Sequence, residues 1–281
     1  MRLRIWGCRG SVPTPGPETV DCGGNTSCVE VSLESGTALV LDAGTGIRRL
    51  GDELVERGAK QVHLLLTHLH LDHVEGLRFF APLWDERIRV DIWGPPSPLL
   101  SLKERISRSF SPPLFPIDLG DVPALVHFHD VPRSKWTIDG AVLAAHLVVH
   151  PGPTVGYRIE SGNASFAYLP DHEPALAGRF VERSTDWISG AAVAENVDLL
   201  LHDAQYSEDE YEARIGWGHS SVPDAVAFAR AVKARRLLLF HHEPTHSDAR
   251  LEDLEACAQS LAAGDKVPPT LAREGMVVEL P

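Results

Sequence analysis

The sequence predicts an α/β fold in which two β-sheets pack face to face and helices cover them from outside. Short apolar runs of strand length recur along the 281 residues and end in loops that contain Gly or His. Segments with helical spacing lie between these runs, and the order of strands followed by helices occurs twice. Strands are expected at residues 27–33, 37–41, 62–67, 143–149, 155–159, 165–169, 197–201 and 236–240. Helices are expected at residues 47–57, 74–80, 185–195, 222–233 and 251–262.

The first expected elements are a hairpin and a buried strand. The apolar runs 27–33 and 37–41 are separated by Glu34, Ser35 and Gly36, which are typical of a turn. Residues 62–67 form a continuous apolar run, as in a strand that is buried on both faces. No Ser/Gly linker or low-complexity run divides the chain, so we expect a single domain spanning 1–281.

A proline-rich segment at residues 94–118 interrupts this pattern and also carries a short cationic stretch around Arg105. An insertion of this length is usually a surface loop, and such loops often cover active sites. It is expected to be a lid or a dimer contact, and an ordinary crossover loop is the plainer interpretation.

The charge balance limits the choice of partners. The chain has 39 acidic and 26 basic residues, a net charge of −13. Such a surface repels phosphate backbones over long range, which argues against stable nucleic-acid binding. A small anionic substrate remains compatible with it, because bound metal ions reverse the local field.

The expected location is the cytoplasm, because neither the N-terminus nor any later segment has the apolar stretch of a signal peptide or a membrane span. The cysteines form no CxxC pair, so free thiols are expected at Cys8, Cys22, Cys28 and Cys257.

Four residues of metal-ligand type follow the strand at 62–67 within six positions: His68, His70, Asp72 and His73. In extended chain His68 and His70 point to the same side, because side chains alternate with a period of two. The chain must then turn, which brings Asp72 and His73 to face a neighbouring point. This arrangement suits two metal ions, and imidazole with carboxylate suits zinc as well as manganese or iron.

His-x-His-x-Asp-His is also the signature of the metallo-β-lactamase superfamily, and the chain resembles that superfamily at three later strand ends, at His150, Asp171 and His241. The resemblance implies a four-layer αββα sandwich. It also implies a first ion on His68, His70 and His150, a second on Asp72, His73 and His241, and Asp171 between the two. His242 is the alternative to its neighbour His241, and His146 competes with His150 from the middle of an apolar run.

Further segments resemble the phosphodiesterase and tRNA 3′-endonuclease branch of this superfamily. They are Cys-Arg-Gly-Ser-Val-Pro at residues 8–13, Gly-Gly-Asn-Thr-Ser-Cys at 23–28 and Leu-Asp-Ala-Gly-Thr-Gly at 41–46. Asp42 would accept a proton from a ligand His and fix its tautomer. The plainer alternative is that Asp42 caps the helix expected at residues 47–57.

Two late elements, His202-Asp203-Ala204 and Gly218-His219-Ser220-Ser221, resemble the acid–His pair that protonates the leaving oxygen in this branch. Asp203 stands where the branch has Glu, so the backbone must close the distance that the shorter side chain leaves. The candidate catalytic residues are therefore Asp203 and His219, together with Asp72, which is also a ligand. His63, His127, His129, His172 and His246 are expected to be surface or supporting residues.

The resemblance implies a hydrolase in which two metal ions about 3.5–4 Å apart activate a water as hydroxide for attack on a phosphodiester. The tRNA endonucleases of the branch insert a long tRNA-binding arm between the third His and the bridging Asp, and residues 150 and 171 leave no room for one. The first interpretation is therefore a small-substrate phosphodiesterase, with a cyclic nucleotide as the favoured substrate. The alternative is a tRNA 3′-processing endoribonuclease.

Other classes share much of this pattern. A carboxylic ester or thioester hydrolase of the same fold would have most of the same ligands, but Gly-His-Ser-Ser at residues 218–221 favours phosphoesters. A non-enzymatic metal-binding scaffold would typically lack ligands, and here the full set is present. A homodimer is also expected from the family.

Overall fold

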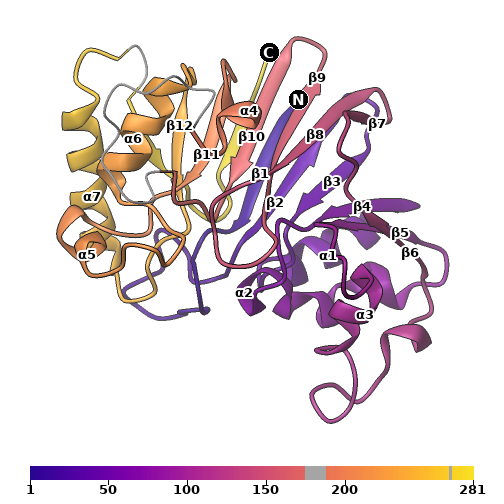
Figure 1. The fold of residues 1–281 in the computed structure, drawn as a ribbon. Helices are drawn as coiled ribbons and strands as arrows, with labels where there is room; N and C mark the ends of the chain where they lie inside the picture. Colours follow the sequence, from indigo (N-terminus) through magenta and orange to yellow (C-terminus); the bar gives the residue numbers. More distant parts are fainter. Residues whose placement is uncertain (175–187, 266–267) are drawn as a thin grey trace.

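The computed structural model describes residues 1–174, 188–265 and 268–281. These residues form two seven-stranded sheets, which lie face to face at the centre of the molecule (Figure 1). The first sheet, in spatial order, consists of β14 (Val277–Glu279), β1 (Arg2–Gly7), β2 (Cys28–Ser32), β3 (Ala38–Leu41), β4 (Gln61–Leu65), β5 (Arg89–Gly94) and β6 (Leu125–Asp130). The second consists of β13 (Thr270–Leu271), β12 (Leu237–Phe240), β11 (Leu199–Asp203), β10 (Ala164–Leu169), β9 (Val155–Ser161), β8 (Ala141–Leu147) and β7 (Trp136–Ile138).

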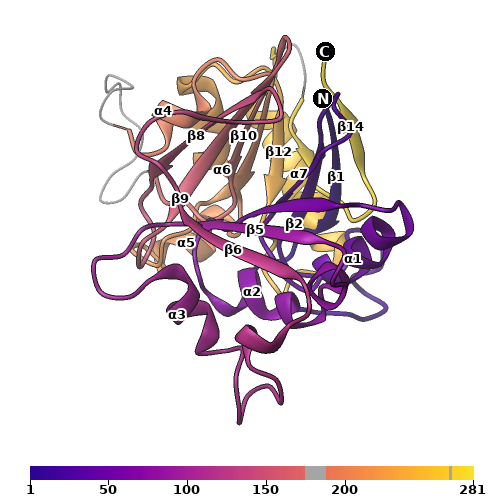
Figure 2. The same cartoon turned by 90° about the vertical axis from the view of Figure 1, so that its right-hand side faces the viewer.

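Helices lie outside both sheets. Beside the first sheet are α1 (Ile47–Glu56), α2 (Leu71–Val74), α3 (Leu102–Ser107) and the 3₁₀ helices η1 (Glu75–Phe79), η2 (Ala81–Trp84) and η3 (Leu119–Asp121). Beside the second are α4 (Ala191–Ala194), α5 (Glu208–Glu212), α6 (Val222–Ala231) and α7 (Asp248–Leu261). The predicted αββα sandwich is confirmed. Figure 2 shows the N- and C-terminal strands β1 and β14 side by side, as their antiparallel pairing requires.

The space between the sheets is filled by apolar side chains from both of them. Leu3 and Val31 of the first sheet belong to the same buried cluster as Tyr157, Phe166 and Leu201 of the second. Burying one such side chain contributes roughly 1.5–3 kcal/mol, so this layer holds the two sheets in a defined register. Separate apolar clusters lie beneath the outer helices of each sheet.

Several strands and helices differ from the sequence expectation. The expected strands are present with shifted ends, whereas β1, β5, β6, β7, β13 and β14 were not predicted. The helix expected at 74–80 is instead η1, which follows the short helix α2. Gly76 there packs directly on the Gly44 carbonyl, where a Cβ atom would come within 2.2 Å of the oxygen. The helix expected at 185–195 is reduced to α4, and residues 185–187 lie outside the described residues.

The proline-rich segment 94–118 contains the helix α3. Ser101 and Glu104 form a capping box at its start, and Leu102 and Ile106 are buried. This part is therefore packed onto the first sheet, while Leu99 and Leu114 are exposed. Whether the segment acts as a lid or a dimer contact stays a prediction. Among the described residues, no helix is both long enough and apolar enough to cross a membrane.

The strand directions bring the candidate residues together. β3, β4, β5 and β6 are parallel in the first sheet, and β10, β11 and β12 are parallel in the second. The carboxyl ends of parallel strands meet at one edge, so the loops after β4, β10, β11 and β12 converge there (Figure 1).

Candidate metal centre

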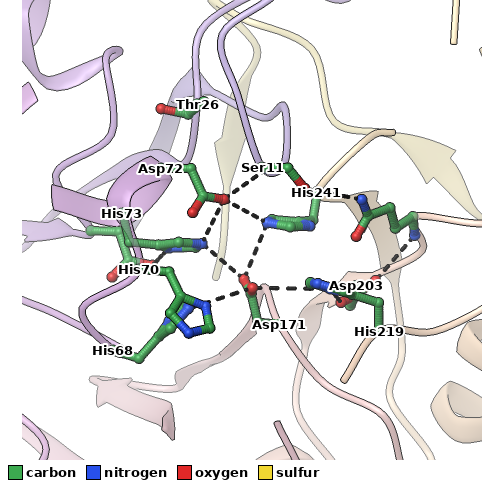
Figure 3. Close-up of polar contacts among 12 residues, drawn as sticks. Ser11, Thr26, His68, His70, Asp72, His73, Asp171, Asp203, His219 and His241 are labelled. Carbon is green, nitrogen blue, oxygen red and sulfur yellow. Dashed lines mark hydrogen bonds and ion pairs between the residues drawn. The ribbon is translucent and has the colours of Figure 1, made fainter. Parts of the chain in front are cut away.

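The seven residues predicted as ligands lie together at this edge. Figure 3 labels all of them except His150. Their donor atoms form two groups, each with atoms within 4.8 Å of one another. One group is His68, His70, His150 and Asp171, and the other is Asp72, His73 and His241.

The first group gathers around one carboxylate oxygen of Asp171. His68 Nε2 lies 3.6 Å and His150 Nε2 lies 3.5 Å from Asp171 Oδ2. His70 Nδ1 is 3.1 Å from His150 Nε2, so the three rings face one point from three directions.

The second group gathers around the other oxygen of the same carboxylate. His73 Nε2 lies 3.0 Å and His241 Nε2 lies 3.3 Å from Asp171 Oδ1. Asp72 Oδ2 is 3.2 Å from His241 Nε2 and 3.3 Å from His73 Nε2. The two oxygens of Asp171 therefore face two different sets of donors.

The donor atoms fit divalent metal ions. His68 Nε2, His73 Nε2 and Asp171 Oδ1 are buried and have no hydrogen-bond partner among the described residues. Buried polar atoms are rarely left unpaired, and metal coordination would satisfy these three. A metal needs neutral imidazoles and ionised carboxylates, which the site favours at His68 and His150 but not at His73. Burial lowers the pKa of His73, but the carboxylates of Asp171, Asp72 and Asp42 outweigh burial and raise it well above its usual range. Burial lowers the pKa of His68 well below its usual range and that of His150 to about 4.

Asp171 is held as the carboxylate. Its complete burial favours the neutral acid, but the imidazoles of His241 and His73 outweigh burial and hold its pKa well below the usual range. Asp171 therefore has the ionised form that a metal ligand needs.

Asp42 orients His73 from behind. Its carboxylate accepts hydrogen bonds from the Thr67 amide (2.7 Å), the Tyr168 hydroxyl (3.0 Å) and His73 Nδ1 (2.8 Å). The bond to Nδ1 turns Nε2 toward Asp171 and fixes the tautomer. The alternative helix-capping role is wrong, because the N-cap residue of α1 is Gly46 and no side chain caps the helix.

Close backbone packing places two of the other rings. A Cβ atom at Gly10 would come within 2.4 Å of the His241 ring, and one at Gly218 within 2.5 Å of His150 Nδ1. His241 adopts φ 61°, a left-handed conformation that is uncommon outside glycine and that aims its ring at Asp171. The neighbouring His242 points away and bonds the Ala272 carbonyl, and His146 is exposed. The structure therefore brings His241 and His150 into the site, and not their competitors.

His219 and Asp203 form a pair beside the ligands. His219 Nδ1 donates to Asp203 Oδ2 over 2.7 Å and lies 4.0 Å from Asp171 Oδ2. The Asp203 carboxylate also accepts from the amides of Gln205 and Ser220, which anchors it. The backbone thus closes the distance that the shorter Asp side chain leaves. Burial disfavours the charged imidazole, but Asp203 outweighs it and raises the pKa of His219 to about 9.

The comparisons with known proteins agree with this geometry. The sequence profile described as Beta-lactamase superfamily domain matches residues 37–242, well over half of the chain. The chain belongs to this family. It is a metal-dependent hydrolase, as the resemblance implied.

Three similar proteins span the whole chain. Ribonuclease Z of Haloarcula marismortui is 29% identical, and the alignment covers 98% of this chain and 96% of that protein. The solved structure of human tRNase Z, short form, has a TM-score of 0.66, with 20% identity and 100% of both chains covered. A diphosphatase of the PhnP family has a TM-score of 0.67, with 20% identity and 99% and 97% covered. At these identities the two structures show the shared fold.

Sequence reasoning missed several buried polar residues around the site. Glu173 is buried two positions after Asp171, and its carboxylate holds the loop before His219 by accepting from the Gly216 and Gly218 amides. His172, expected to be a surface or supporting residue, is buried and bonds His202, so it is a supporting residue of the site. Its position next to Asp171 at a strand end was the available signal.

A third group, Asp91, His127 and His129, lies on β5 and β6 and has donor atoms within 4.8 Å. Asp91 accepts two hydrogen bonds from the Arg89 guanidinium and one from His129. Its charge is already compensated by a cation, so this group is an ion-pair network of the first sheet.

Proposed function

We propose that this chain hydrolyses phosphodiesters with two metal ions held at the edge of the sandwich. His68, His70 and His150 would hold one ion, Asp72, His73 and His241 the other, and Asp171 would contribute one oxygen to each. The single observation that carries this proposal is the way the two oxygens of Asp171 face two separate donor sets. Zinc suits these donors best, and manganese or iron are the alternatives.

Bound ions would lower the pKa of a shared water and neutralise the phosphate oxygens. The side chains beside the ions would supply the proton that the leaving oxygen needs. His219, protonated through Asp203 and only 11% exposed, would donate its proton to the departing oxygen. A proton donor placed in this way typically contributes about 10²–10⁴-fold to the rate.

The substrate we propose first is an RNA phosphodiester of the tRNA 3′-processing type. It is supported by the full-length similarity to a protein named Ribonuclease Z. This replaces the cyclic nucleotide as first choice, because no comparison names that substrate.

A small phosphodiester, including a cyclic nucleotide, is the second candidate. It is favoured by the short connection between His150 and Asp171, which consists of the β9–β10 hairpin and leaves no long arm to grip a tRNA. The net charge of −13 favours it as well.

One experiment distinguishes these two substrate proposals. Metal-loaded protein is given a precursor tRNA with a 3′ extension, a 3′,5′-cyclic nucleotide and bis(p-nitrophenyl) phosphate, with the Asp171→Ala variant as the control. Cleavage of the precursor RNA, lost in the variant, supports the first proposal. Cleavage of only the small diesters supports the second. No cleavage of any of them contradicts the phosphodiesterase assignment and favours the ester and thioester hydrolases of this fold.

A further inference from the structure

A pocket of about 530 Å³ adjoins the candidate metal centre on the side where His219 lies. Its wall includes Gln205, Tyr206, Arg214, Trp217 and Glu243. Neither the proposed metal ligands nor the proposed acid–His pair explains these side chains.

Trp217 is 59% exposed at this pocket, although an indole is among the most favourable side chains to bury. The backbone on both sides of it is held by one buried carboxylate, because Glu173 accepts from the amides of Gly216 (2.8 Å) and Gly218 (2.7 Å). The Trp217 amide donates to the Arg214 carbonyl. The ring is thus exposed on a fixed backbone, which suits it for stacking on a flat ligand.

Gln205 supplies a second, independent sign of a ligand. It is only 2% exposed and lines the pocket, yet its Oε1 has no hydrogen-bond partner among the described residues. Its Nε2 donates to the Glu243 carboxylate (2.8 Å) and to Ser11 Oγ (3.3 Å), which fixes the amide orientation. An unpaired buried acceptor next to an open pocket calls for a hydroxyl or amino donor from a ligand.

The charges of the pocket point to a nucleoside attached to a phosphate. The Arg214 guanidinium lies 4.9 Å from the Tyr206 ring centre and 6.0 Å from that of Trp217, and within the described residues no carboxylate pairs with it. Glu243, on the wall of the same pocket, disfavours a second free phosphate there and can accept from a hydroxyl or amino group.

We propose that this pocket is a nucleoside subsite for the substrate of the metal centre. An aromatic base lies on Trp217, a hydroxyl or amino group of the nucleoside donates to Gln205 Oε1, and Arg214 attracts the adjoining phosphate. The inference rests on the proposed phosphodiesterase function and adds the part of the substrate that lies beside His219.

The test measures binding by calorimetry on the metal-loaded protein, with adenosine 5′-monophosphate, ribose 5-phosphate and inorganic phosphate as probes. Base stacking contributes about 1–3 kcal/mol, so Trp217→Ala should weaken the binding of adenosine 5′-monophosphate about 5- to 150-fold. Trp217→Phe should retain most of the affinity, because it keeps an aromatic face. Gln205→Met should lower the affinity for adenosine 5′-monophosphate about 2- to 10-fold.

Ile215→Ala is the matched control, because Ile215 is 55% exposed in the same loop and does not line the pocket. Its affinity for all three probes should equal that of the wild type. Ribose 5-phosphate and inorganic phosphate should bind Trp217→Ala as they bind the wild type.

The outcomes distinguish this inference from the proposed function. The subsite is overturned, and the metal centre stands, if inorganic phosphate binds but Trp217→Ala leaves the affinity for adenosine 5′-monophosphate unchanged. The same holds if Trp217→Ala weakens the binding of ribose 5-phosphate as much as that of adenosine 5′-monophosphate. If none of the probes binds the wild type and bis(p-nitrophenyl) phosphate is not cleaved, the proposed function fails and the subsite falls with it.

Discussion

Replacing His219 by Ala tests the proton donor that the geometry places beside the metal centre. Burial lowers the pKa of His219, but Asp203 outweighs it and raises the pKa to about 9, so the imidazolium is the major form at pH 7.5. The proton is therefore available to a leaving oxygen. Its loss should lower turnover of an RNA or alkyl phosphodiester about 10²–10⁴-fold, equivalent to roughly 3–5 kcal/mol of transition-state stabilisation.

The assay compares two leaving groups. A dinucleoside phosphate expels a basic alkoxide that needs the proton, whereas thymidine 5′-(p-nitrophenyl phosphate) expels an acidic phenolate that does not. The His219→Ala variant should lose activity on the first and keep most of it on the second, with its metal content unchanged. His146→Ala, a change at an exposed histidine of β8, is the control for both measurements.

Two results would refute this reasoning. Equal loss on both substrates with metal retained would mean that His219 does not act as an acid. Loss of metal from His219→Ala would mean that it is a ligand or a structural residue.

Three further predictions follow from the same contacts. Asp203→Asn removes the carboxylate that favours the imidazolium of His219. The alkaline limb of the pH profile of kcat/KM, expected near pH 9 in the wild type, should therefore move down toward the ordinary His pKa of about 6.5. An unchanged limb would mean that the titration belongs to another group. Asp171→Ala should lose most of its bound metal, as measured by atomic emission. In the wild type, free metal at about 1,000 times its Kd adds roughly 4 kcal/mol of stability, so a chelator should lower the Tm, and this decrease should largely disappear in the variant. Metal retained by the variant would contradict the bridging role. Tyr168→Phe removes the hydroxyl that donates to Asp42 and should lower the free energy of unfolding by about 1 kcal/mol in urea titrations, and an unchanged midpoint would show that the bond adds nothing.

The sequence by itself determined eight of the strands in the two sheets and the set of candidate ligands. His68, His70, Asp72 and His73 follow a buried strand within six positions, so their spacing and the strand geometry already placed them at one edge. The later residues each follow an apolar run of strand length, which is a local pattern. Fold family and candidate ligand set were accessible for this reason. In β1 and β5 charged residues alternate with apolar ones, and the edge strands are short or polar, so none of these strands has such an apolar run.

Tertiary structure decided everything that depends on how distant segments meet. The sequence favours His241 over its neighbour His242 because His241 directly follows an apolar strand, but the choice depends on the backbone. The left-handed conformation at His241 turns its ring toward Asp171, while the His242 ring bonds the Ala272 carbonyl. The distance from Asp203 to His219 depends on how the loops after β11 and before α6 pack, so the short side chain could not be judged from spacing. The same holds for Gln205 and Trp217, which line one pocket from either side of α5 along the chain. The periodicity of apolar residues indicates which side chains of one segment are buried. The contacts between distant segments form only when the two sheets and their loops pack together.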